Sequence, residues 1–183
     1  MNTRKLTLTA LFIAVNVVLS TVIVIPLGAI KAAPVQHFVN VLSVVILGPW
    51  YGLAQAFLSS CIRVMFGTGT PFAFPGSMIG VLLGSLFYYV NRHLFVAAIG
   101  EVIGTGIIGS LVCIPLAWIL NVDHFLIKPL MAAFIVSSMI GASISYALLI
   151  LLKRRGVLKH LDLNRKYRKK QLNDESSVWV GLT

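Results

Sequence analysis

The stretch that decides the fold is residues 32–62, AAPVQHFVNVLSVVILGPWYGLAQAFLSSCI, which contains no formal charge. A helix needs roughly 20 apolar residues to cross a bilayer. The stretch is therefore long enough for two short spans. The turn signal Gly48-Pro49 lies near its middle. We expect two helices here, over about 34–48 and 50–66.

Charge-free runs continue on both sides of this stretch. Residues 6–30, 64–91 and 129–152 carry no charge, and residues 94–122 carry only Glu101. Each run is long enough for one span. The expected spans are about 6–25, 76–91, 94–120 and 129–152.

The composition agrees with lipid as the solvent. The chain is 58% hydrophobic and 11% charged, whereas soluble domains carry roughly a quarter charged residues. A cleaved secretory signal is the less favoured interpretation of the first run, because that run is longer than the usual apolar core of a signal peptide. The sequence predicts an all-α integral membrane protein with a six-helix transmembrane domain over residues 1–153.

Lysine and arginine are distributed unevenly between the two sides of this topology. With a cytoplasmic N-terminus, three lie outside, namely Lys31, Arg63 and Lys128. Twelve lie inside, namely Arg4, Lys5, Arg92, Lys153, Arg154, Arg155, Lys159, Arg165, Lys166, Arg168, Lys169 and Lys170. The positive-inside rule produces such a bias, so both termini are expected in the cytoplasm.

The last part of the chain, residues 154–183, is basic and polar and cannot bury a core. We expect a short interfacial helix followed by a disordered end. In this position the basic tail faces anionic lipid or a protein partner, and not nucleic acid.

Polar residues inside a bilayer are costly, so each of them marks a possible site. Gln36, His37 and Asn40 share one face of the second predicted helix, at spacings of three and four residues. The topology places them in the outer third of the protein. Polar and aromatic residues expected near them are Arg63, Thr68, Thr70, Phe72, Phe74, Ser77, Trp118, Asp123 and His124. A few polar groups beside aromatic rings are typical of a small-molecule site, although a single histidine at a helix start also fits a bond to the backbone.

Glu101 is the only acidic residue inside a predicted span. Its burial requires a partner or protonation. Three interpretations stay open: an ion pair with Arg63 that braces the third and fifth helices, a contact with a ligand, or a step in a proton relay.

Several functions are not supported by any motif. The P-loop pattern, H-E-x-x-H and G-x-S-x-G do not occur in the chain. Cys61 and Cys113 fall inside apolar spans, where cysteine serves as a small packing residue. No enzyme activity, cofactor or metal site is expected, and the chain has no visible source of energy.

Small residues recur every four positions in several predicted helices. The sets are Gly76-Gly80-Gly84, Gly100-Gly104, Ser137-Gly141-Ser145 and, in the first helix, Ala10 with Ala14. Such spacing lets helix backbones approach closely in lipid. For the first three sets we favour packing within the chain.

The combination of six spans, an outer polar cluster and no energy source resembles the substrate-binding S components of energy-coupling factor (ECF) vitamin transporters. More specifically it resembles the ThiW branch, which is linked to uptake of the thiazole precursor of thiamine. The matching stretches are Pro34-Val35-Gln36-His37 with Asn40, Leu47-Gly48-Pro49-Trp50-Tyr51, Arg63 before Gly67-Thr68-Gly69-Thr70, Phe74-Pro75-Gly76-Ser77-Met78-Ile79-Gly80, and Gly100-Glu101-Val102-Ile103-Gly104-Thr105-Gly106. Residues beyond Lys153 carry no part of the resemblance.

The resemblance implies a plasma-membrane subunit that binds a thiamine precursor, expected to be hydroxyethylthiazole, at its outer face. The implied binding residues are Gln36, His37, Asn40, Arg63, Thr70, Phe72, Phe74, Ser77, Glu101 and Thr105. The implied partners are a transmembrane coupling protein, docking at Ala10 and Ala14, and two cytoplasmic ATPases. The alternatives are another ligand (hydroxymethylpyrimidine, thiamine or a pyridoxine-like vitamin), a membrane scaffold, or an intramembrane enzyme. A scaffold has no use for the intramembrane polar residues, and an enzyme requires a nucleophile or metal cluster.

Overall fold

The computed structural model describes residues 3–27, 30–122 and 124–158. Its α-helices are α1 (Thr3–Val22), α2 (Pro34–Ile46), α3 (Pro49–Met65), α4 (Ala73–Asn91), α5 (Leu94–Glu101), α6 (Ser110–Ile119) and α7 (Ile127–Arg154). A π-helix, η1 (Val102–Gly109), joins α5 to α6, and the 3-10 turn η2 (His124–Leu126) precedes α7. Strands β1 (Ile25–Leu27) and β2 (Ile30–Ala32) form a short antiparallel hairpin. The expected interfacial helix and disordered end of the tail lie outside the described residues.

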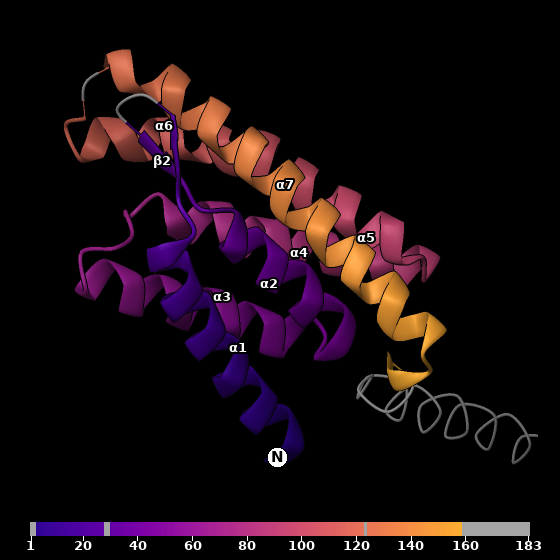
Figure 1. Ribbon diagram of the computed structural model, residues 1–183. Helices are drawn as coiled ribbons and strands as arrows, with labels where there is room; N and C mark the ends of the chain where they lie inside the picture. Colours follow the sequence, from indigo (N-terminus) through magenta and orange to yellow (C-terminus); the bar gives the residue numbers. More distant parts are fainter. Residues whose placement is uncertain (1–2, 28–29, 123, 159–183) are drawn as a thin grey trace, which may run out of the picture.

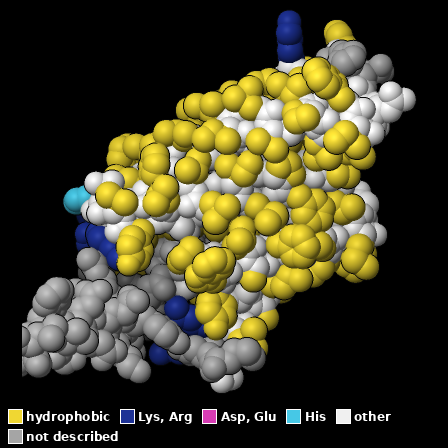
Figure 2. Space-filling view, turned by 180° about the vertical axis from the view of Figure 1, so that it is seen from behind, with side chains coloured by type: hydrophobic (Ala, Val, Ile, Leu, Met, Phe, Trp, Pro, Cys, Tyr) yellow, Lys and Arg dark blue, Asp and Glu magenta, His cyan; other side chains and the backbone are white. Residues whose placement is uncertain are grey.

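The helices have the character of a membrane protein. Four helical segments within the described residues are long and apolar enough to cross a bilayer: Thr3–Val22, Ala73–Asn91, Leu94–Ile119 and Ile127–Arg154. Figure 2 shows apolar side chains over the middle of one face, with lysine and arginine side chains toward its ends. The prediction of an all-α membrane protein is confirmed at this level, whereas the six crossings and their orientation stay predictions.

Two further helices, α2 and α3, take the places expected for the second and third spans. Their 13 and 17 residues rise only about 20 and 25 Å. Both values are below the roughly 30 Å of a hydrocarbon core. For α2 the shortness has a structural reason, because every residue of this helix except Phe38 is buried.

Helix α2 lies in the middle of the helix arrangement (Figure 1). It contacts α1, α3, α4, α5 and α7. Its valines Val41, Val44 and Val45 belong to the main apolar core, which also contains Val81 of α4 and Leu149 of α7. The residues on α2 are therefore surrounded by protein on several sides.

The glycines of α4 face those of the α5–η1–α6 segment at very short range. A Cβ atom on Gly100 would lie 2.7 Å from Gly84 Cα, and one on Gly104 would lie 2.7 Å from Gly80 Cα. Real Cβ contacts are not this short, so the two backbones touch because neither side carries a side chain there. The predicted packing within the chain is confirmed for these two sets of small residues.

Helix α1 is inverted relative to a helix of a soluble protein. Its buried residues are the polar Lys5, Thr9, Asn16 and Ser20. Its outer surface is apolar and includes Leu11 and other exposed large side chains. An apolar outer face and a polar inner face are what a lipid environment selects.

The chain leaves the helical conformation earlier after α1 than the sequence suggested. The first span was predicted to reach residue 25, but α1 ends at Val22 and β1 begins at Ile25. The β-branched residues Ile23, Val24 and Ile25 favour extended backbone. Pro26 then disfavours helix at the residue before it.

We predict that Gly104→Ala lowers the free energy of unfolding by about 1–3 kcal/mol, as overpacking does in a tight core. The added Cβ would meet backbone atoms of α4, which have no rotamer to change. The measurement is unfolding of the purified protein in detergent. Ala147→Leu is the control, since it adds apolar volume at an exposed position of α7. Equal stability of the two variants would show that the α4–η1 contact is loose.

Candidate functional site

The Glu101 carboxylate is the centre of a buried polar cluster. Glu101 ends α5 and is 0% exposed. Its Oε1 accepts hydrogen bonds from Asn40 Nδ2 at 2.9 Å and from Thr105 Oγ1 at 3.1 Å. The same oxygen lies 3.0 Å from His37 Nδ1. One carboxylate oxygen thus has three polar neighbours, supplied by α2 and η1.

The helices place these groups by simple spacing. His37 and Asn40 are three residues apart on α2, so both side chains face α5. Thr105 lies four residues after Glu101, inside the π-helix. Its hydroxyl also contacts Gly76 O of α4 at 3.0 Å. A π-helix is rare and occurs mostly at functional sites, which fits its position directly after the buried acid.

The space for the carboxylate comes from Gly80 of α4. A Cβ atom on Gly80 would lie 2.6 Å from Glu101 Oε2 and would collide with Thr105 Oγ1. The same glycine that lets α4 and η1 touch therefore also makes room for the acid. Neither role tolerates a side chain at this position.

Arg63, at the end of α3, belongs to a neighbouring part of the cluster. It is 4% exposed. Its Nη1 donates to Gln36 Oε1, and its Nη2 lies 3.5 Å from Thr68 O. Gln36 Nε2 in turn donates to Ala73 O at 3.4 Å. Arg63 therefore connects α3 to α2 and to the segment before α4.

The ion pair between Arg63 and Glu101, one of three interpretations of the sequence, is not formed within the described structure. Glu101 is paired with His37, and Arg63 is bonded to Gln36. Gln36 and His37 are consecutive residues on α2, so their side chains point about 100° apart. Helix α2 thereby separates the two charges that the sequence suggested would meet.

Ser77 is the other predicted residue that joins the cluster. It is 0% exposed. Its carbonyl oxygen lies 3.4 Å from Asn40 Nδ2. Its hydroxyl donates to Ala73 O at 2.8 Å and lies 3.3 Å from Ser60 Oγ. Ser60 was not predicted, although it is a hydroxyl residue inside an apolar span.

The remaining predicted residues lie apart from the carboxylate. Thr70 is exposed in the segment between α3 and α4. Phe72 is buried in a separate apolar cluster with Cys113, Ala117 and Leu130. The ring of Phe74 packs against that of Phe57, with centroids 5.7 Å apart. Trp118 is 63% exposed. Asp123 and the side chain of His124 lie outside the described residues.

The depth of the cluster also differs from the expectation of an outer-third site. Leu94–Ile119 is continuous over 26 residues, and Glu101 closes the 8 residues of its first part, α5. At 1.5 Å per residue, the carboxylate lies about 12 Å from the start of this segment and about 27 Å from its end. The start is the end predicted to be cytoplasmic, so along this helix the acid lies deeper than expected.

A second buried polar cluster lies between α1 and α3 and was missed by the sequence reading. Asn16 Nδ2 donates to Ser59 Oγ at 2.9 Å. Ser20 Oγ donates to Asn16 Oδ1 at 3.0 Å, and Gln55 Nε2 to Ser59 Oγ at 3.3 Å. The available signal was polar residues spaced by four in both helices. Ser59 is adjacent to Ser60, so the two polar clusters meet along α3.

Three buried atoms of the main cluster have no hydrogen-bond partner in the described structure: Glu101 Oε2, Asn40 Oδ1 and Arg63 Nε. Each unpaired buried group costs about 1–3 kcal/mol. Two of the atoms accept hydrogen bonds and one donates. The set is suited to a small polar ligand that donates at least once and accepts once. Because the three residues are at most 4% exposed, such a ligand reaches them only when neighbouring segments move.

The comparison with protein families agrees with a role in uptake. The family model of ThiW, the thiamine-precursor transporter protein, matches residues 6–155. Among curated proteins none matches the sequence. The matched part includes every residue of both polar clusters and ends before the basic tail. Because the match covers most of the chain, the protein belongs to the ThiW family of thiamine-precursor transporter proteins.

Proposed function

We propose that the chain is the substrate-binding subunit of an ECF-type ABC transporter in the plasma membrane. Its substrate is a thiamine precursor, with hydroxyethylthiazole as the first candidate. The observation that carries the proposal is the set of three unpartnered polar atoms around Glu101 in a chain without a nucleotide-binding motif. Membership of a thiamine-precursor transporter family supports the substrate class.

A neutral thiazole alcohol complements the unpartnered atoms. Its hydroxyl donates a hydrogen bond to Glu101 Oε2, and its ring nitrogen accepts one from Arg63 Nε. Both contacts involve an ionisable group of the protein, and such hydrogen bonds are stronger than neutral ones. The ligand satisfies one buried acceptor and one buried donor, and Asn40 Oδ1 is left for water or for a further ligand group.

An aminopyrimidine alcohol is the second candidate, and one observation favours it. The cluster has two unpartnered acceptors, Glu101 Oε2 and Asn40 Oδ1. A hydroxymethylpyrimidine with an exocyclic amine supplies donors to both, and its ring nitrogens accept from Arg63 Nε. Affinity for the two ligands therefore separates the candidates, because only the pyrimidine satisfies all three atoms.

The energy for uptake comes from partners in this proposal. A transmembrane coupling protein and two cytoplasmic ATPases supply the nucleotide chemistry that the chain lacks. Ala10 and Ala14 lie one turn apart on α1, and both are exposed. Small exposed residues on a lipid-facing helix allow close approach of another helix. This strip of α1 is the proposed docking site of the coupling protein.

The first test separates binding from transport. We expect the purified chain to bind hydroxyethylthiazole or the aminopyrimidine in calorimetric titration. Proteoliposomes that contain this chain alone, supplied with ATP, should accumulate neither ligand. Accumulation by the lone chain would refute the proposed division of labour, and failure to bind either ligand would refute the substrate assignment.

The second test concerns the cluster around Glu101. Glu101→Gln, His37→Ala and Asn40→Ala should each weaken ligand binding by roughly three- to thirty-fold, because each removes a contact worth about 0.5–2 kcal/mol. Ser138→Ala is the matched control, since this buried hydroxyl bonds only to Ile135 O of its own helix in the described structure. Affinity is measured by calorimetry and folding by a thermal melt. Unchanged affinity in all three variants would exclude this site.

The third test concerns α1. The double variant Ala10→Trp with Ala14→Trp should leave ligand binding nearly intact and abolish uptake in cells, because bulk there keeps a partner helix away. Ser143→Trp with Ala147→Trp is the control pair, with the same spacing on an exposed face of α7. Equal loss of uptake in both pairs would contradict a specific role of the α1 strip.

A further inference from the structure

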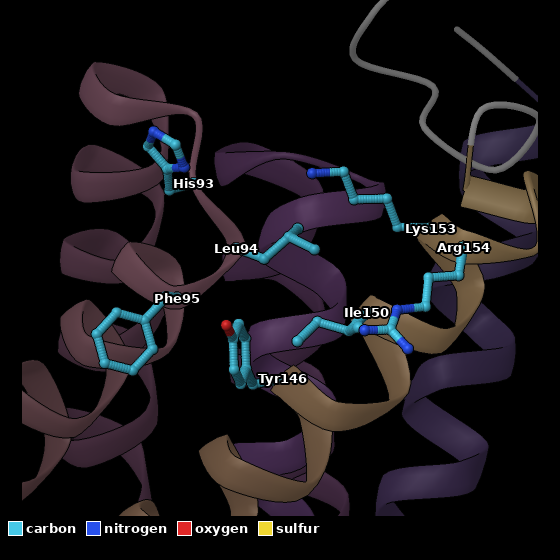
Figure 3. A pocket seen from close by; sticks show the side chains of 7 residues that line it. All are labelled: His93, Leu94, Phe95, Tyr146, Ile150, Lys153 and Arg154. Carbon is cyan, nitrogen blue, oxygen red and sulfur yellow. The ribbon is translucent and has the colours of Figure 1, made fainter.

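A cavity of about 450 Å³ lies between the start of α5 and the end of α7. This volume falls in the range of roughly 300–1,000 Å³ that is typical of ligand pockets. The cavity is separate from the cluster around Glu101, and none of the proposed substrate-binding residues lines it. Figure 3 shows residues of two elements around it, with His93, Leu94 and Phe95 on one side and Tyr146, Ile150, Lys153 and Arg154 on the other.

One part of the cavity wall is positively charged. Lys153 and Arg154 are exposed in the last turn of α7. Figure 3 shows the Lys153 side chain extending from α7 toward the His93 side of the cavity. Opposite these two residues, α5 begins at Leu94 without a side-chain cap, so the first backbone N–H groups of that helix add partial positive charge.

Acidic side chains do not balance this charge in the described part of the chain. Glu101 is the only acidic residue there, and it is buried beside His37. Lysine and arginine at the end of a helix also offset the dipole of their own helix. That role explains their charge, but it does not explain a cavity in front of them. The electrostatics favour an anion as the occupant.

The other part of the wall is apolar. Leu94, Phe95 and Ile150 line it, and Phe95 is 55% exposed. The Phe95 ring packs against that of Tyr146, with centroids 5.4 Å apart. A free inorganic anion gains nothing from such a wall. A molecule with a charged phosphate joined to an aliphatic chain contacts both halves of the cavity.

We infer that this cavity binds the headgroup of an anionic phospholipid. The phosphate lies against Lys153, Arg154 and the start of α5, and the first methylene groups of the acyl chains lie along Leu94 and Ile150. Basic pockets between helices at the cytoplasmic side of a membrane are suited to such headgroups. The positive-inside distribution of the sequence places this end of α7 on that side.

The test uses the full chain, purified without lipid in a neutral detergent and titrated under native mass spectrometry. Phosphatidylglycerol should bind as a saturable single-lipid complex, at least tenfold more tightly than phosphatidylcholine. The deacylated headgroup, glycerophosphoglycerol, should compete poorly because it cannot use the apolar wall. Equal binding of the two lipids, or full competition by the headgroup alone, would overturn the inference.

Matched variants separate the cavity from bulk charge. Lys153→Gln with Arg154→Gln should weaken phosphatidylglycerol binding about tenfold, since each cation near a membrane surface contributes a factor of roughly five. Lys128→Gln with Arg155→Gln removes the same charge from exposed positions that do not line the cavity, and it should bind as the unaltered protein does. Equal weakening in both pairs would show attraction by net charge and refute the site. A thermal melt of each variant verifies that the fold is intact.

Discussion

A carboxylate that is removed from water inside a membrane domain must be surrounded by hydrogen-bond donors, and this requirement arranges the helices around Glu101. The desolvation of a charged group costs several kcal/mol even after the protein relaxes. Helix α2 contributes His37 and Asn40, and η1 contributes Thr105. Without the acid, the polar face of α2 would have no partner of matching chemistry at the centre of the bundle.

The close packing of α4 against the α5–η1 segment and the polar cluster depend on the same residues. Gly80 touches η1 at Gly104, and it also leaves the space that Glu101 Oε2 occupies. The distance between these helices is therefore fixed by backbone contact, which gives the acid a rigid wall on one side. On the side of α2 and α3 the contacts are side-chain hydrogen bonds, and two of them, at 3.4 and 3.5 Å, are long. A motion that admits a ligand is easier on that side.

Much of the fold could be predicted because charge is excluded from the apolar segments. The pair Gly48-Pro49 was expected to separate two helices, and α2 ends at Ile46 while α3 begins at Pro49. The residues His37, Asn40 and Glu101 stood out for the same reason, as polar side chains in apolar surroundings. Physical cost is thus visible in a sequence even where structure is not.

The pairing within the cluster could not be predicted in the same way. Arg63 and Glu101 have opposite charges and comparable expected depth, but the direction of each side chain depends on helix rotation. A rotation of one residue on α2 would exchange the roles of Gln36 and His37. The π-helix η1 has no sequence signature that we can name. Phe72 and Phe74 were grouped with the polar residues by proximity along the chain, whereas packing directs them to other apolar side chains.

The length of α2 has a consequence for how the protein is made. A helix of 13 residues with three polar side chains in its first two turns is a poor substrate for insertion into lipid on its own. Enclosed by five other helices, it does not have to match the thickness of the bilayer. The last of these neighbours to be synthesised is α7, so on the ribosome α2 waits incompletely covered until almost the whole chain has emerged. Its entry into the membrane should therefore be coupled to that of α3, as a hairpin, and its final position should be reached only when α7 closes over it.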